Sequence, residues 1–506
     1  MAVFITLAVC ALFLTYVWYK HKFTYWSRRG VFNPEPVFPF GNIKEVIRRR
    51  QQFFQPYCDA YFKYKHLPYV GLYCFHRPVL CVNDLEMAKN ILIKDFEHFQ
   101  SRGTYSGGEG DRLAGNLFNI HGQVWKKLRL KISPSFSPMK VKTVFPIVEK
   151  IANDTRDYAD LLHSNGESVN FSELYGRYAM EIIANIGFGL ECNGLKKTES
   201  EFYDRGREYF NPPTLYWTII RAFAFIAPDT FDKLQMKRIS DRVENFFFGL
   251  VKYTVDHRLG HAYRRNDFLQ ALIDLRTRAQ RKGDAKTSDE FPFSMNDLAA
   301  NTMLYMIAGY ETSATTGQFT AYQLALNPHI QDKVRDEITR VLEKHGGRCT
   351  YEAQNEMTYF NMVLEETMRM YPSMRAIFRR CTKDYRMPGT DLVIEKGTQV
   401  FVPCESIHMD PEIFPQPEKY DPERFTPEKK AQFHPCHWMP FGEGPRKCLG
   451  VRQGYIQSKM ALLKILQDFE LVLDERTLVP MKLKVSSLVP QAEGDVWIKL
   501  KRLPKK

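Results

Sequence analysis

The sequence predicts a mostly α-helical fold with a smaller β part and an N-terminal membrane anchor. Three observations predict it: an uncharged apolar run at residues 2–19, long stretches of helical periodicity, and short strand-like stretches that form one pair at 69–82, a second pair around 392–402 and further strands at 469–499. The composition is 44% hydrophobic and 25% charged, as in globular proteins, which excludes a disordered or fibrous chain.

The apolar run at residues 2–19 is just long enough to span a bilayer as a helix. Trp18 and Tyr19 end it as interfacial anchors, and four cations follow within ten residues, so the positive-inside rule places the rest of the chain in the cytosol. No charged segment precedes the run and no small-residue cleavage site follows it, which favours an uncleaved anchor over the alternative of a cleaved signal peptide. We therefore expect an anchor at 1–20 and a basic, proline-rich hinge at 21–41.

The positive charge is concentrated at the two ends of the chain. Of 71 Lys and Arg residues, four lie within residues 1–30 and five within 499–506, where no acid occurs, and the body between is nearly neutral against 58 acids. This pattern gives no support to a nucleic-acid partner. Ten cysteines occur without a C-x-x-C pair, which argues against a disulfide scaffold or a zinc ribbon, and the His434–His437 stretch has no second donor cluster for zinc.

The longest predicted helix covers Met295–Leu326. Ser294 and Asp297 form a capping signal before it, and Asn327-Pro328 ends it. At 1.5 Å per residue such a helix is about 48 Å long, and its apolar middle predicts a central buried position. The aromatic stretch 209–228 has two readings that can both hold: core packing, or an apolar surface that contacts the membrane interface.

The strongest functional signal is the stretch Phe441–Gly450, F-G-E-G-P-R-K-C-L-G. Three glycines around one cysteine predict a tight turn that presents a single sulfur, with Arg446 two residues away. A thiolate presented in this way suits an axial metal ligand. Six fixed positions make a chance match rare, on the order of one in 10⁵.

Here the chain resembles the cytochrome P450 family of haem-thiolate monooxygenases, whose cysteine-loop pattern is F-G-x-G-x-R-x-C-x-G. The other motifs of that family occur upstream in the family's order: W-x-x-x-R at 125–129, A-G-x-E-T-S at 308–313, E-x-x-R at 366–369 and P-E-R-F at 422–425. Glu365 also lies within reach of Arg369, but the motif frame selects Glu366. The W-S-R-R-G-V stretch at 26–31 is similar to the insect family-6 microsomal branch, which usually has Phe where this chain has Tyr310.

The resemblance covers nearly all of residues 31–506 and therefore implies one catalytic domain, at 42–506, with a P450-like fold and the long helix over the haem. It implies haem b with Cys448 as the axial iron ligand, Glu311 and Thr312 as the catalytic proton-delivery pair, and a structural network of Glu366, Arg369 and Arg424 behind the haem loop. We also expect a local kink in the helix at the A-G-x-E-T-S motif. The cofactor-binding residues it implies are Cys448, Arg446, Trp125, Arg129, Arg102, Arg375 and Phe441, and the candidates for the substrate pocket are Phe118, Ala308, Ala376, Ile377 and Leu488.

The resemblance also implies partners. Electrons would come from NADPH through a separate NADPH-cytochrome P450 reductase, because the chain has no G-x-G-x-x-G motif of its own, and cytochrome b5 is a further candidate partner. Both would meet the chain at the endoplasmic reticulum membrane, where it would oxidise small lipophilic substrates with O2. The cations expected at the reductase docking surface are Lys126, Lys127, Lys131 and Lys447.

Three other functions stay open at this point. A monooxygenase of endogenous hormone or lipid metabolism differs from one that oxidises xenobiotics, such as plant toxins or insecticides, only in pocket shape. A haem-thiolate isomerase or dehydratase, or a non-catalytic haem carrier, is disfavoured by the Glu311-Thr312 pair. The sequence does not identify the substrate.

Overall fold

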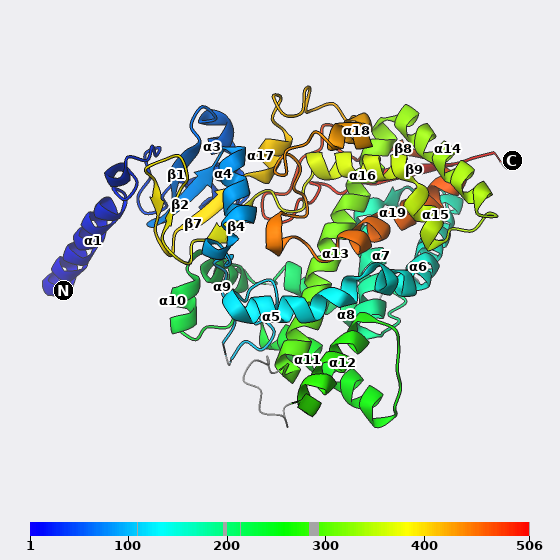
Figure 1. The fold of residues 1–506 in the computed structure, drawn as a ribbon, viewed down its shortest axis with the longest axis horizontal. Coiled ribbons are helices and arrows are strands. Elements are labelled where there is room, and N and C mark those ends of the chain that lie inside the picture. Colours follow the sequence, from blue (N-terminus) through cyan, green and yellow to red (C-terminus); the bar gives the residue numbers. More distant parts are fainter. Residues whose placement is uncertain (109, 196–199, 213, 283–292, 505–506) are drawn as a thin grey trace.

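The computed structural model describes residues 1–108, 110–195, 200–212, 214–282 and 293–504, so Pro213 of the aromatic stretch and the terminal cations Lys505 and Lys506 lie outside the described residues. A β-rich part and a larger helical part lie side by side, and the helix α1 projects away from both (Figure 1). The predicted class, mostly α with a smaller β part, is confirmed.

Helices make up most of the described chain. They are α1 (Ala2–Lys22), α2 (Lys44–Ile47), α3 (Gln55–Lys63), α4 (Leu85–Lys89), α5 (Gly122–Ile132), α6 (Pro138–Ser164), α7 (Phe171–Ile183), α8 (Glu201–Phe210), α9 (Leu215–Ile226), α10 (Pro228–Lys233), α11 (Asp241–Gly260), α12 (Phe268–Lys282), α13 (Met295–Leu326), α14 (Pro328–Lys344), α15 (Tyr351–Glu356), α16 (Thr358–Met370), α17 (Cys404–His408), α18 (Pro427–Lys430) and α19 (Val451–Asp468).

The strands form three small sheets. The first has the order β1 (Tyr69–Cys74), β2 (Arg77–Val82), β7 (Gln399–Val402), β4 (Ile377–Arg380), with β2 and β7 parallel; the second has the order β3 (Val169–Asn170), β9 (Trp497–Arg502), β8 (Phe469–Leu473); the third pairs β5 (Tyr385–Arg386) with β6 (Val393–Ile394). The hairpin predicted at 69–82 is present, and the strands predicted at 469–499 pair as β8 and β9. The pair predicted at 392–402 is wrong, because β6 and β7 belong to different sheets.

Helix α13 begins and ends at the predicted residues and runs through the middle of the helical part (Figure 1). The Ser294 hydroxyl accepts a hydrogen bond from the Asp297 amide at 3.1 Å, and the Asp297 carboxylate accepts one from the Ser294 amide at 2.8 Å, which completes a capping box. Gly317 lets the helix contact α7 closely, since a Cβ there would lie 1.9 Å from the Tyr175 ring. The helix is therefore held rigidly enough to position groups along its length.

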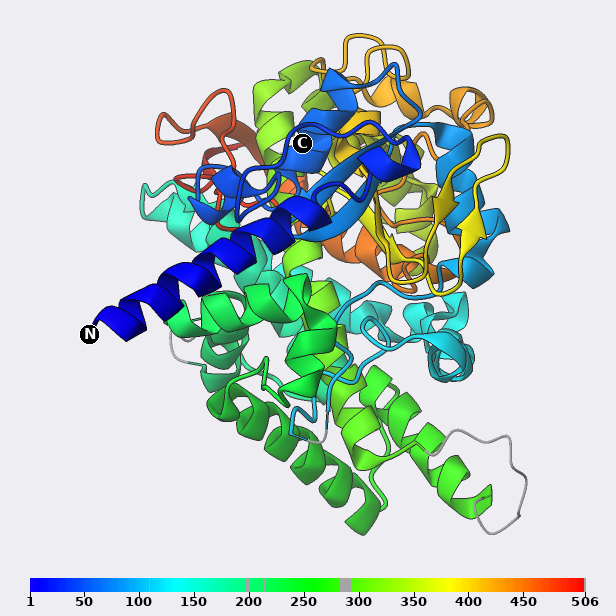
Figure 2. The ribbon, with the colours of Figure 1, turned by 90° about the vertical axis from the view of Figure 1, so that its left-hand side faces the viewer.

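The segment after α1 is packed against the first sheet rather than extended into solvent. Trp26 is fully buried, its indole N–H donates to the Leu72 carbonyl at 3.0 Å, and its ring covers Gly71, where a Cβ would be 2.4 Å away. The Gly71 amide donates to the Phe32 carbonyl at 2.9 Å. These contacts fix the direction in which α1 leaves the body, as Figure 2 shows.

Candidate functional site

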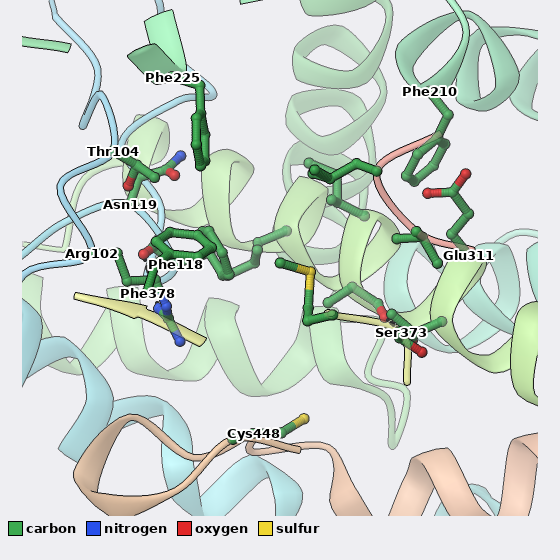
Figure 3. A pocket seen from close by; sticks show the side chains of 18 of the residues that line it. Arg102, Thr104, Phe118, Asn119, Phe210, Phe225, Glu311, Ser373, Phe378 and Cys448 are labelled. Atoms are coloured by element: carbon green, nitrogen blue, oxygen red, sulfur yellow. Dashed lines mark hydrogen bonds between the residues drawn. The ribbon is translucent and has the colours of Figure 1, made fainter. Parts of the chain in front are cut away.

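The loop that carries Cys448 is shaped by two glycines in the left-handed region. Gly442 has φ 70° and Gly444 has φ 73°, and a Cβ on Gly444 would lie 1.8 Å from the Leu92 carbonyl oxygen, so no other residue fits there. The Cys448 amide donates to the Phe441 carbonyl at 2.9 Å and closes the turn. Cys448 lies on the floor of a large cavity (Figure 3), into which its side chain is accessible.

Burial raises the pKa of the Cys448 thiol, although a backbone hydrogen bond involving Gly450 and the positive charge of Arg129 act in the opposite direction. The protein alone therefore does not hold this sulfur as a thiolate. A bound metal cation does so for any coordinating thiol.

Behind the loop lies a buried ionic network. Arg369 and Glu366 are both fully buried on α16 and form a bidentate pair, with Nε to Oε2 at 2.7 Å and Nη2 to Oε1 at 2.9 Å. The Arg424 Nε lies 3.4 Å from the same carboxylate, although the angle does not allow a hydrogen bond. The three residues named from the E-x-x-R and P-E-R-F motifs therefore meet in one cluster, whereas Glu365 binds Lys430 and Tyr455 instead.

His408 connects this network to the cysteine loop, and it was not predicted. Its carbonyl accepts from Arg369 Nη1 at 2.9 Å, and its ring Nε2 accepts from the Met439 amide, just before the loop, at 2.8 Å. Burial, then the charge of Arg369, lowers the pKa of His408 to about 3, so the ring is neutral and able to accept this bond.

Four arginines surround one side of the cavity: Arg102, Arg129, Arg379 and Arg446. Within the described ranges, none of the four forms a salt bridge with an acidic side chain; they donate to backbone carbonyls, such as Arg446 Nη2 to Ile120 at 2.7 Å and Arg129 Nη2 to Lys447 at 2.7 Å. Burial, then repulsion from the other three, lowers the pKa of Arg446 below its ordinary value. Because a guanidinium stays charged in proteins, the cluster is an uncompensated positive site.

Two buried donors beside these arginines have no hydrogen-bond partner in the described structure: the Trp125 indole N–H and the Arg379 Nε. The Arg446 guanidinium lies 4.3 Å over the Trp125 ring, so the tryptophan and the arginine are held together. Unpaired donors and uncompensated charge are the features that two carboxylates would satisfy. The residues present therefore fit haem, whose propionates are carboxylates.

One predicted cofactor residue is wrong. Arg375 points away from the cavity: it pairs with Glu405, and it also donates to Gln52 and to Gln55, the last at 2.7 Å. Arg379, four residues later, lines the cavity instead. Arg375 precedes strand β4, whereas Arg379 lies within it, and the adjacent Arg380 alternates to the other face and pairs with Asp229.

The acid–hydroxyl pair lies on α13, above Cys448. The Thr312 hydroxyl donates to the Ala308 carbonyl at 2.6 Å. The backbone is α-helical throughout this stretch, so the expected kink does not interrupt the helix. Burial raises the pKa of Glu311 to about 7, although a hydrogen bond from Gln491 acts to lower it. Glu311 points toward the cavity from the side opposite Phe118 (Figure 3), so a carboxyl group that gains and loses protons near neutrality lies beside it.

The cavity has a volume of about 1210 Å³, which includes the position that haem would take, and it is lined mainly by apolar side chains. Phe118, Phe225 and Phe378 lie together on one wall, and Phe210 lies on the other (Figure 3). All five pocket candidates line the cavity: Phe118, Ala308, Ala376, Ile377 and Leu488. Phe441, Trp125, Arg129, Arg102 and Arg446 line it as well.

The comparisons with known proteins agree with this arrangement. The Cytochrome P450 family model matches residues 32–497. The chain is 36% identical to Cytochrome P450 6a2 of Drosophila melanogaster over 99% of both chains, and 36% identical to Cytochrome P450 6k1 of Blattella germanica over 94% of this chain and 92% of that protein. It is 35% identical to Probable cytochrome P450 6a14 of Drosophila melanogaster over 99% of both. The predicted resemblance is confirmed, and the chain belongs to the cytochrome P450 family of haem-containing oxidoreductases.

Proposed function

We propose that the protein is a membrane-anchored monooxygenase that transfers one oxygen atom from O2 to lipophilic substrates. The observation that supports it most directly is that Cys448 and the Glu311–Thr312 pair face one apolar cavity from different elements. Haem bound there would supply the chemistry of oxygen activation. A haem carrier would need the cysteine loop but not the acid and hydroxyl on α13.

Each group in the chain has a distinct task in this proposal. Cys448 would ligate the haem iron, and Arg102, Arg129, Arg379, Arg446 and Trp125 would bind its propionates. Glu311 takes up a proton and passes it toward Thr312, whose hydroxyl oxygen can accept a hydrogen bond while its proton is donated to the Ala308 carbonyl. The apolar wall excludes water from the substrate.

Lipophilic substrates suit the cavity because its roof and walls are aromatic and aliphatic. Phe378 contacts both Phe118 and Phe225 edge to face, and the three rings form an apolar surface. The similarity to insect family-6 relatives extends the proposal to xenobiotics such as plant toxins or insecticides. Oxidation of endogenous lipids uses the same site with a different fit to this wall.

The membrane and the electron donor complete the proposal. Helix α1 has a hydropathy of 2.1 over its apolar window and no buried residue, which suits a bilayer span by length and composition. Leu215 and Ile219 of α9 are 61% and 57% exposed while Ile220 and Ala224 on the same helix are buried, so one face packs into the body and the apolar exposed face supports contact with the membrane interface. α1 and α9 lie on the same side of the body in Figure 2, and we propose that both meet the endoplasmic reticulum membrane.

A separate reductase would deliver NADPH-derived electrons near the cysteine loop. Lys126 on α5 and Lys447 in the loop are both exposed, and α5 contacts the loop through the hydrogen bond from Arg129 to the Lys447 carbonyl. Together with Lys127 and Lys131 they give a basic surface suited to an acidic partner. Cytochrome b5 would use the same surface.

The test is the carbon monoxide difference spectrum of the reduced full-length protein in membranes, with Cys448→Ser as the matched variant. We expect a red-shifted Soret band in the wild type that the variant lacks. NADPH oxidation with added reductase and a set of lipophilic compounds then identifies substrates. Folded, haem-loaded wild-type protein without this band would refute thiolate ligation, and a band without any reductase-dependent product would favour the haem-carrier function.

A further inference from the structure

The carboxyl group of Glu311 has a direct partner from a distant part of the chain. The Gln491 side-chain Nε2 donates to Glu311 Oε1 at 2.5 Å, and the two residues are 180 positions apart. Gln491 lies at the end of the turn 484–491, and it lines the cavity together with Ser487 and Leu488 of the same turn. None of the motifs in the sequence includes Gln491.

The turn holds Gln491 in a defined orientation. The Lys484 amide donates to the Gln491 carbonyl at 2.8 Å, and the Ser487 hydroxyl donates to the Gln491 Oε1 at 3.0 Å. Because Oε1 accepts from Ser487, the amide nitrogen has to face Glu311, so the donor is oriented before any ligand enters. Thr315, one helical turn after Glu311, donates its hydroxyl to the Pro490 carbonyl at 3.2 Å and fixes the turn to α13.

We propose that Gln491 is a positioning residue for the proton-delivering Glu311, holding its carboxylate at the cavity wall through the Ser487–Gln491–Glu311 chain of hydrogen bonds. The proposal rests on the proposed monooxygenase function, and it adds a residue that sets when Glu311 releases its proton. A donor to the carboxylate stabilises the ionised form, so Gln491 acts against the burial that favours the protonated form. Removal of the donor makes Glu311 retain its proton to a higher pH.

The charged groups on the surrounding elements do not take over this role. Glu173 on α7 pairs with Arg177, Arg207 on α8 lies over the Tyr203 ring, and Lys484 on the same turn pairs with Asp495. On α13 itself the neighbouring titratable group is Tyr310, whose pKa burial raises above its ordinary value, so it stays neutral. On α19 the neighbour is the uncharged Gln457, which donates to the Gly309 carbonyl at 3.2 Å. Burial and Gln491 are the two causes of the Glu311 shift.

The test compares the wild type with Gln491→Met, which keeps the side-chain length and removes the donor, in full-length protein with reductase and one accepted substrate. The quantities are product formed per NADPH oxidised and hydrogen peroxide released, as a function of pH. In the wild type we expect the coupled fraction to fall as pH rises through about 7, where Glu311 loses its proton. In Gln491→Met the inflection moves upward by about one pH unit, the size expected for a hydrogen bond to a charged group.

Two further variants separate positioning from general support of the turn. Thr315→Val removes the other contact between the turn and α13 without touching Glu311, and its inflection stays at the wild-type pH. Glu311→Gln, alone or combined with Gln491→Met, has no inflection in this range. Infrared spectra recorded between pH 6 and pH 8 follow the Glu311 carboxyl band directly, which Glu311→Gln identifies and which needs no turnover.

The outcomes are distinguishable. A wild type that forms no product at any pH overturns the proposed function. A productive wild type whose inflection and carboxyl band are unchanged in Gln491→Met overturns the role of Gln491, and so does a Thr315→Val variant that shifts the inflection as far.

Discussion

The buried Glu366–Arg369 pair makes a sharp prediction about stability. Arg369 is fully buried and donates four hydrogen bonds to oxygen atoms: two to Glu366, one to the His408 carbonyl at 2.9 Å and one to the Pro417 carbonyl at 2.6 Å. Arg369→Leu leaves the Glu366 carboxylate buried with a weaker set of partners. These are the Asp421 amide at 2.9 Å and the Arg424 Nε at 3.4 Å.

The magnitude follows from what is left unpaired. Removing one partner of a buried ion pair costs about 3–5 kcal/mol, and we expect Arg369→Leu to lie in this range. Arg424 is less buried, its Nε makes no hydrogen bond to Glu366, and its other contact is to the Gln416 carbonyl, so Arg424→Leu costs about 1–2 kcal/mol. Lys252→Met breaks an exposed pair with Asp256 on α11 and costs less than about 0.5 kcal/mol.

The assay is urea unfolding of the full-length, haem-loaded protein in detergent, followed by circular dichroism and tryptophan fluorescence. Arg369→Lys is the second variant at this position, because it keeps the charge, loses the bidentate geometry and is more certain to fold. The reasoning is refuted if Arg424→Leu destabilises the protein as much as Arg369→Leu. It is also refuted if Arg369→Leu and Lys252→Met unfold at the same urea concentration.

Two other predictions concern α13 and its acid. Gly317→Ala places a Cβ 1.9 Å from the Tyr175 ring and should lower the free energy of unfolding by about 1–3 kcal/mol, whereas Gly249→Ala on α11 meets nothing within 4 Å and should raise it by about 0.5–1 kcal/mol; equal effects in urea unfolding would contradict the packing argument. The folded pKa of Glu311, about 7, lies above the ordinary value of 4.5, so the stability that its proton contributes is complete below 4.5 and is lost as pH rises through 7. Between pH 4.5 and pH 8 the free energy of unfolding of Glu311→Gln should therefore rise by about 3 kcal/mol relative to that of the wild type. Parallel curves of unfolding free energy against pH for the two proteins would refute this.

Much of the site could be predicted because its residues lie in short local patterns. The bounds of the helix Met295–Leu326 were predicted correctly, because the capping residues and the Asn327-Pro328 pair lie directly at its two ends. The cysteine loop was recognisable because a positive φ and a close approach at Gly444 allow only glycine, so the constraint is visible in the sequence. Backbone geometry that only one residue type can adopt is therefore visible as that residue type in the sequence.

The residues that the sequence did not reveal are those whose role depends on contacts between distant segments. Arg379 rather than Arg375 lines the cavity because Arg375, before β4, is bound by Glu405 and by two glutamines from a distant segment, and the sequence does not show these contacts. His408 and Gln491 act through single hydrogen bonds to Met439 and Glu311, which no spacing rule connects. The pairing of β6 with β5 is likewise a tertiary choice.

The two sides of the cavity carry opposite electrostatic problems, and this gives the best physical reason for the cofactor. Burial raises the pKa of the Cys448 thiol, so a thiolate there needs a neighbouring positive charge. Burial and mutual repulsion lower the pKa of Arg446, so the arginine cluster needs a neighbouring negative charge. A single group that presents a metal cation to the sulfur and carboxylates to the arginines resolves both at once. Haem has this distribution of charge, and its binding should therefore raise the free energy of unfolding of the wild type. Cys448→Ser and Arg446→Leu should each show a smaller increase on haem binding than the wild type.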